Sequence, residues 1–223
     1  MRLRKKKHLE ERIDNSREYL VVKENRDFYD LLENERYNFL DTEKLFGNKN
    51  PIHLEVGCGK GGFILDMAKK YPNINFLAVE KLSNVIICAI DKVRENNIKN
   101  VKFLCIDASN IHYFIPHHSV ERIYLNFSCP WPKPKYKNQR LTNHRFLRLY
   151  DRLLTEKGEI WQKTDSMPFF EYSLEQFSSY GFKLKNISCD LHNSDIDYNV
   201  MTEYEKYFSG IGKPIYRLEA YRR

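Results

Sequence analysis

Several features that define common protein classes are missing from this sequence. Its five cysteines stand singly and no Cys-x-x-Cys pair occurs, which argues against a zinc ribbon, a thiol redox motif and a disulfide framework. His117 and His118 are adjacent and His112 is nearby, but no cysteine or acid completes a metal site with them. We therefore predict no metal ion.

Long apolar segments are missing as well. No stretch approaches the roughly 20 consecutive apolar residues of a membrane-spanning helix, and the amino terminus lacks the apolar core and cleavage site of a secretory signal. We expect a cytoplasmic protein with no membrane partner. A chain of 223 residues can bury a full core, and the sequence is compatible with a monomer or a homodimer.

Positive charge is in excess, with 37 Lys and Arg residues against 30 Asp and Glu residues. Five of residues 2–7 are basic, and a second cluster comprises Lys133, Lys135, Lys137 and Arg140. Either cluster alone is as typical of a solvated surface as of a binding surface. Two clusters together favour a polyanionic partner such as a nucleic acid.

The chain divides at a run of turn-forming residues, 47–51. We predict a basic N-terminal helical extension over 1–50, with helices at 10–20 and 28–39, and a second domain over 51–223. No internal repeat or low-complexity segment is present.

After residue 51, apolar runs alternate with segments of helical periodicity. The runs predicted as strands are 52–56, 75–79, 101–106, 122–127, 158–163, 182–189 and 215–221. The segments predicted as helices are 62–71, 83–96 and 142–154. This alternation indicates an α/β fold with a doubly wound, mostly parallel sheet of about seven strands, in which the last two strands pair antiparallel.

A glycine-rich turn follows the first of these strands. Gly57, Gly59 and Gly62 match the dinucleotide-binding spacing, and the helix after them would direct free backbone N–H groups at a ligand. Glycine permits the tight turn and a close approach of a ligand to the backbone. The match is weak by itself, since such turns also occur for structural reasons.

Acidic residues end or follow three successive strands. Glu80 can accept hydrogen bonds from both hydroxyls of a ribose, and Asp107 can accept one from an adenine amino group. Glu55 precedes the glycines, where a carboxylate suits a cationic ligand and would repel the pyrophosphate of NAD. Glu80 suits NAD and S-adenosylmethionine equally well, whereas Glu55 favours S-adenosylmethionine, which carries a sulfonium and an ammonium group.

A second loop follows the strand at 122–127. Asn126 ends the strand, and the rigid Pro130-Trp131-Pro132 leads to Lys133. Ligands of open α/β sheets bind at the carboxyl ends of strands, so this loop suits a planar, negatively charged substrate. Trp131 either stacks on a base or covers the core. The stripe of Tyr204, Tyr207 and Phe208 is predicted to belong to the core.

Six motifs occur in an order and spacing that we compare with known enzymes. They are Glu55-x-Gly57-x-Gly59, Ala78-Val79-Glu80, Asp107-Ala108, Asn126-Phe127-x-x-Pro130-Trp131-Pro132-Lys133, Lys163-Thr164-Asp165 and Thr202-Glu203-Tyr204-Glu205. Over about residues 50–223 the pattern resembles the bacterial tRNA (guanine-N7-)-methyltransferases. The resemblance implies a Rossmann-like fold and transfer of a methyl group from S-adenosylmethionine to N7 of a guanosine in the tRNA variable loop, with S-adenosylhomocysteine as the product.

The resemblance also implies which residues bind each partner. The cofactor-binding residues would be Glu55, Gly57, Gly59, Glu80, Asp107 and Asn126. The tRNA-binding residues would be Lys133, Lys135, Lys137, Asp165, Thr202, Glu203, Tyr204 and Glu205.

The chain departs from the family at Cys129, where the family usually has an aspartate that is often named catalytic. N7 of guanine has an in-plane lone pair and no proton to lose, so its methylation needs no general base. A carboxylate can orient guanine through its N1–H and N2 edge, and Asp165 or Glu205 can take that part. The candidate catalytic residues are therefore Cys129, Asp165 and Glu205, and a covalent role for Cys129 is not needed.

Three alternatives remain. An NAD-dependent oxidoreductase would need a second mononucleotide-binding half and a hydride-transfer residue, and neither is visible. A non-catalytic RNA-binding module is disfavoured by the intact acids at the strand ends. A methyltransferase for a small molecule or a protein is disfavoured by the basic clusters.

Overall fold

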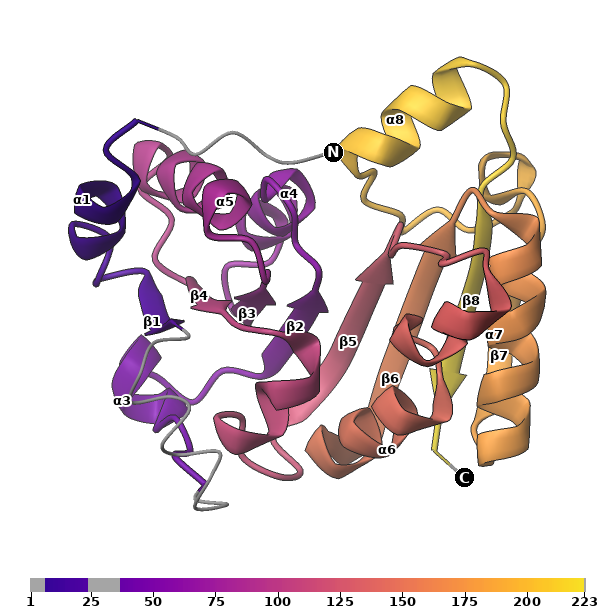
Figure 1. Ribbon diagram of the computed structural model, residues 1–223, viewed down its shortest axis with the longest axis horizontal. Coiled ribbons are helices and arrows are strands. Elements are labelled where there is room, and N and C mark those ends of the chain that lie inside the picture. Colours follow the sequence, from indigo (N-terminus) through magenta and orange to yellow (C-terminus); the bar gives the residue numbers. More distant parts are fainter. Residues whose placement is uncertain (1–6, 24–36, 223) are drawn as a thin grey trace. The chain divides into compact units, whose positions relative to one another are not determined.

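The computed structural model describes residues 7–23 and 37–222, which form two compact units, Met1–Pro116 and His117–Arg223. In Figure 1 the first unit runs from indigo to magenta and the second continues to yellow. The predicted boundary between residues 50 and 51 stays a prediction. Within the described ranges, no helix is long and apolar enough to cross a membrane.

The first unit is a parallel sheet with the strand order β1-β4-β3-β2. Its strands are β1 (Leu20–Lys23), β2 (Ile52–Val56), β3 (Asn75–Val79) and β4 (Val101–Cys105). Its helices are α1 (Leu9–Asp14), α3 (Thr42–Phe46), α4 (Gly62–Lys70), α5 (Ser83–Glu95) and the 3-10 helix η1 (Ala108–Tyr113). Every residue of β2 and β3 is buried, as expected for strands of a parallel sheet.

The second unit has the strand order β5-β6-β8-β7. Its strands are β5 (Val120–Asn126), β6 (Leu154–Thr164), β7 (Lys183–Ser188) and β8 (Tyr216–Tyr221), and its helices are α6 (His144–Leu153), α7 (Met167–Tyr180), α8 (Glu203–Gly210) and the 3-10 helices η2 (Pro134–Gln139) and η3 (Leu191–Asn193). Strands β5 and β6 are parallel, whereas β8 is antiparallel to both β6 and β7. The predicted α/β class and the antiparallel pairing of the last two strands are confirmed.

The amino-terminal predictions were partly wrong. The helix predicted over 10–20 ends at Asp14, and Leu20–Lys23 forms β1, a strand that the sequence did not signal. Strand β1 is stabilised by pairing with β4, a contact that local periodicity does not encode. Most of the helix predicted over 28–39 lies outside the described residues, and the part at 37–39 is not helical.

Candidate functional site

The glycine turn lies between β2 and α4 and is joined to the end of β3. The backbone N–H groups of Gly57 and Cys58 both donate to the carbonyl of Val79, at 2.8 and 3.0 Å. Gly57 and Gly59 have φ of +85° and +56°, a region that costs other residues free energy. A Cβ added to either glycine would meet nothing within 4 Å, so the turn faces open space.

Gly61 is required for a different reason. It has φ of +76°, and an added Cβ would lie 2.5 Å from the Cβ of Ala89 on α5. Gly61 therefore permits the close packing of the start of α4 against α5, which the spacing of glycines in the sequence did not reveal.

Two of the predicted acids lie close to the glycine turn. Glu80 accepts hydrogen bonds from the N–H of Gly59 at 3.3 Å and the N–H of Leu82 at 2.9 Å. Glu55 is buried, with 2% of its surface exposed. Burial raises the pKa of the Cys58 thiol, and the charges of Glu55 and Glu80 raise it further. The turn is therefore a site of negative potential, which favours a cationic ligand.

Asp107 follows β4 and caps η1. One carboxylate oxygen accepts from the N–H and the hydroxyl of Ser109, at 2.9 and 2.7 Å, and the other accepts from Nζ of Lys81 at 2.7 Å. Burial raises the pKa of Asp107, but these hydrogen bonds and the charge of Lys81 outweigh it, so the pKa is lowered overall. The structure thus places a charged carboxylate at this strand end.

The second unit carries the loop that follows β5. Asn126 ends the strand, and the N–H of Phe127 donates to the carbonyl of Lys163 on β6 at 2.8 Å. Phe127 and Trp131 have φ of +49° and +43°, which is uncommon for bulky residues. Strain of this kind often accompanies functional sites, and the sequence contains no signal for it.

Arg140 supports the Trp131 backbone. Its Nε and Nη2 atoms donate to the carbonyl of Trp131 at 3.3 and 3.1 Å, and its guanidinium lies 4.3 Å from the ring centre of Tyr172. The ring of Trp131 lies 5.6 Å from that of Tyr136. Arg140 thus contributes to the shape of the loop, whereas Lys133, Lys135 and Lys137 are exposed.

Glu205 is fully buried and has several hydrogen-bonding partners. Its Oε2 lies 2.5 Å from Nζ of Lys163, and its Oε1 accepts from the amide of Asn199 at 2.5 Å. Glu205 also completes a capping box with Thr202 at the start of α8 and lies 3.3 Å from Nε2 of His192. The second predicted carboxylate, Asp165, is partly exposed, with Nζ of Lys213 at 3.7 Å.

Lys163 was part of a motif, but the sequence assigned it no role. Its ammonium also donates to Asn199 and to the carbonyl of Val200, at 3.0 and 2.8 Å. The buried lysine therefore joins the end of β6 to the segment that precedes α8.

A further buried polar group holds that segment, and sequence reasoning missed it. The hydroxyl of Tyr198 donates to Glu219 at 2.6 Å, and Arg217 pairs with the same carboxylate. The guanidinium of Arg217 lies 4.7 Å from the ring centres of both Trp161 and Tyr198. Burial, followed by the hydrogen bond to Glu219, raises the pKa of Tyr198 to about 12.

The prediction that Tyr204, Tyr207 and Phe208 belong to the core was wrong. Tyr204 and Tyr207 are 64% and 62% exposed, and Phe208 is half-buried. Among the described residues of α8, Glu205 is the single buried one. A buried carboxylate takes the position that an apolar stripe was expected to occupy.

The remaining predicted residues, Cys129, Thr202 and Glu203, lie in the second unit. Cys129 and Glu203 are exposed, and Thr202 is buried at the start of α8. Among residues 7–23 and 37–222, no group of three His, Cys, Asp or Glu side chains is placed to hold a metal ion.

Comparisons with known proteins identify the class. Residues 49–218 match the family described as "Putative methyltransferase". The 30S ribosomal A1408 methyltransferase from an uncultured bacterium shares the fold, with a TM-score of 0.56 and 13% identity over 82% of this chain and 93% of that one. Fold and family together define a Rossmann-like methyltransferase.

Curated relatives identify the family more closely. A tRNA (guanine-N(7)-)-methyltransferase of Geobacillus sp. (strain WCH70) is 51% identical over 79% of this chain and 80% of its own length. The protein of the same description from Streptococcus pneumoniae (strain CGSP14) is 43% identical over 99% of both chains. The chain therefore belongs to the tRNA (guanine-N7-)-methyltransferase family, which excludes the oxidoreductase alternative.

Proposed function

We propose that this protein transfers the methyl group of S-adenosylmethionine to N7 of a guanosine in the variable loop of tRNA. The observation that carries the proposal is the match over 99% of both chains to a relative described as a tRNA (guanine-N(7)-)-methyltransferase. Each unit supports it by its own chemistry. The first has an acid-lined glycine turn, and the second has exposed lysines and aromatic rings.

The residues of the first unit fit this cofactor, which supplies a methyl group on a cationic sulfur. Gly57 and Gly59 leave open space beside the backbone, and the charges of Glu55 and Glu80 act on the same turn. We assign cofactor binding in this unit to these four residues and to Asp107, and a cofactor-binding role for Asn126 stays a prediction. The positive charge of the cofactor is attracted by the negative charges of these two carboxylates, which favours its binding.

The chemistry requires alignment more than proton transfer. N7 of guanine is a nucleophile without deprotonation, so the protein must hold the base with its lone pair directed at the methyl group. Such positioning can supply ~7–11 kcal/mol of a reaction barrier. The product guanine is cationic, and a carboxylate at its N1–H and N2 edge would stabilise that charge.

We assign this carboxylate to Asp165 rather than Glu205. Glu205 is buried, with Lys163, Asn199 and Thr202 all donating to it. Asp165 is partly exposed, and its nearest ammonium is 3.7 Å away. Because a hydrogen bond to a charged group contributes about 1.5–3 kcal/mol, Asp165→Asn should lower kcat/KM for tRNA by roughly 10- to 100-fold.

Two outcomes contradict these roles. If Asp165→Asn and Glu205→Gln both retain full turnover, neither carboxylate holds the base. For Cys129 we propose no covalent role, so Cys129→Ala should keep methyl transfer within a few fold. A complete loss, with cofactor affinity unchanged, would require a chemical role for the thiol.

The proposed function is tested by incubating the protein with an unmodified tRNA transcript and labelled S-adenosylmethionine, followed by nucleoside analysis. We expect label in 7-methylguanosine, and none when the variable-loop guanosine is replaced by adenosine. Label in another nucleoside, or in both transcripts equally, would refute the assignment. Titration with S-adenosylhomocysteine and with NADH provides an independent check, since only the first should bind.

A further inference from the structure

Helix α8 and its C-terminal end expose an unusual amount of apolar surface. Tyr204, Tyr207 and Ile211 are 64%, 62% and 57% exposed. The helix is held to its unit through the buried carboxylate of Glu205, so its rings are available on the outside. Contiguous exposed apolar surface of this kind commonly marks a binding site.

The rings around α8 are ordered. We call Phe127, Tyr204, Tyr207 and Phe208 the aromatic ledge. The rings of Phe127, Tyr204 and Phe208 are within 22° of parallel, with centres 6.1–6.4 Å apart. Tyr207 meets Phe208 edge to face, with centres 5.2 Å apart. The ledge begins at Phe127, in the loop that leads from β5 to Lys133 and η2.

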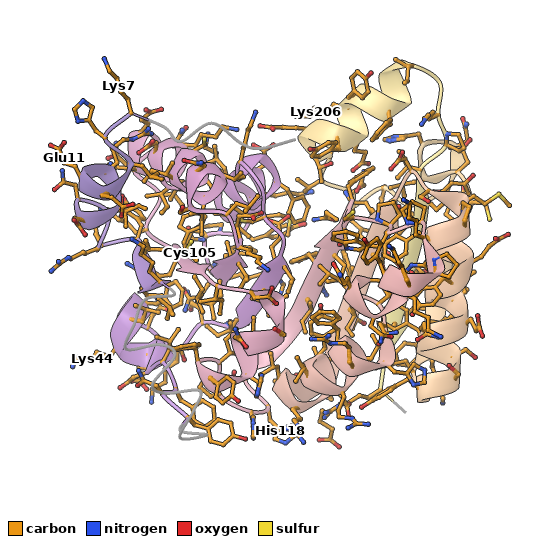
Figure 2. The ribbon with its side chains drawn as sticks, in the orientation of Figure 1. Lys7, Glu11, Lys44, Cys105, His118 and Lys206 are labelled. Atoms are coloured by element: carbon orange, nitrogen blue, oxygen red, sulfur yellow. The ribbon has the colours of Figure 1, made fainter. Side chains whose placement is uncertain are left out.

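Positive charge accompanies these rings. Nζ of Lys213 lies 4.8 Å from the ring centre of Phe208, and its side chain is 51% exposed. Lys206 is exposed on α8 and is labelled in Figure 2. An exposed aromatic ring and a nearby ammonium group match the two chemical parts of a nucleotide, the base and the phosphate.

We propose that the exposed ring of Tyr207, which Phe208 supports edge to face, is a stacking site for an unpaired RNA base other than the guanosine that is methylated. Lys206 and Lys213 contact the phosphates that flank this base. The inference rests on the proposed function for the identity of the RNA. Exposed tyrosine rings bind bases without sequence preference, because every base has a π-face. The hydrogen bonds of Glu205 attach the start of α8 to the rest of the unit.

The ledge is tested by the binding of the full-length protein to two fluorescent RNA oligonucleotides. One is an unstructured oligouridylate, and the other has the same length but abasic ribose at its central positions. The variants are Tyr207→Leu, which keeps apolar bulk without a π-face, and Tyr207→Phe, which keeps the ring. Ile187→Ala, at a 50% exposed apolar side chain on β7 of the same unit, is the matched control.

Tyr207→Leu should weaken binding of the base-containing RNA by about tenfold and leave the abasic RNA unchanged. Tyr207→Phe and Ile187→Ala should bind both RNAs as the unaltered protein does. If Tyr207→Leu lowers the affinity for both RNAs equally, or for neither, the proposal is wrong.

Sedimentation of the same variants tests the competing occupants. If Tyr207→Leu leaves RNA binding unchanged but dissociates an oligomer, the ledge is an interface between copies of the chain and the proposal is wrong. The oligonucleotide measurement does not require methylation. The protein could form no 7-methylguanosine while Tyr207→Leu still weakens binding of the base-containing RNA alone. That result would refute the proposed function and leave the stacking site supported.

Discussion

The buried ion pair between Lys163 and Glu205 leads to the sharpest prediction. The two side chains are 7% and 0% exposed, with Nζ and Oε2 2.5 Å apart. Replacement of Lys163 by Met would leave a buried carboxylate without its ammonium partner. Removal of one member of a buried pair costs about 3–5 kcal/mol. Asn199 and Thr202 still donate to Glu205, so we expect the lower end, ~3 kcal/mol.

Chemical and thermal unfolding of the full chain measures this loss. For a protein of this size, ~3 kcal/mol corresponds to a fall in Tm of roughly 6–12 °C. The double variant Lys163→Met with Glu205→Leu removes both charges. The double variant should lose less unfolding free energy than the two single variants lose together. The difference should be about 2 kcal/mol, the coupling energy expected for two residues in contact.

Lys99→Met is the matched control, because Lys99 pairs with Glu18 at 2.8 Å on the surface, with side chains 70% and 59% exposed. An exposed pair of this kind contributes little to stability, because solvent and salt screen the two charges. If Lys163→Met and Lys99→Met lower stability equally, the buried pair does not hold α8 as we argue.

Three further perturbations test other parts of the structure. Gly61 and Gly212 share a φ of +76°, but a Cβ added at Gly61 would meet Ala89 at 2.5 Å, whereas one added at Gly212 would meet nothing within 4 Å. Gly61→Ala should therefore lower the free energy of unfolding by about 1–3 kcal/mol more than Gly212→Ala does. Equal losses of stability in the two variants would contradict the packing argument. The pKa of Asp107 is lowered from 3.8, so its charge stabilises the fold above that pH and the benefit disappears as pH falls through the folded-state value. The difference in stability between the unaltered protein and Asp107→Asn should therefore vanish in acid, and a difference independent of pH would exclude this role. Lys135→Ala should weaken binding to all tRNA sequences alike and reduce the slope of log affinity against log salt by about one; a slope that stays the same would show that Lys135 contacts no phosphate.

Much of the fold could be predicted from short-range pattern. The bounds predicted for β2 and β3 agree with the structure, because continuous apolar runs between turn residues are typical of buried parallel strands. Strand β1 was missed because its four residues are stabilised by β4, about 80 positions away in the chain. A local pattern cannot signal a pairing over that distance.

The candidate site was also predicted only in part from the sequence. The sequence identified the glycine turn and the acid of β3, and the structure joins them through the hydrogen bond between Gly59 and Glu80. Helical spacing alone could not tell whether Tyr204 and Tyr207 face the core or solvent, since both arrangements have the same period. The roles of Asp165, Thr202 and the tRNA-binding lysines stay predictions.

The sequence by itself determined the class of chemistry, since glycines and acids after successive strands meet at the carboxyl edge of a parallel sheet. Tertiary structure alone decided which carboxylate is buried and which is accessible. Glu205 and Lys163 are 42 positions apart, and their contact depends on how the segment before α8 packs against β6. Burial and pairing of a charge arise from that long-range packing, so residue type and spacing do not specify them.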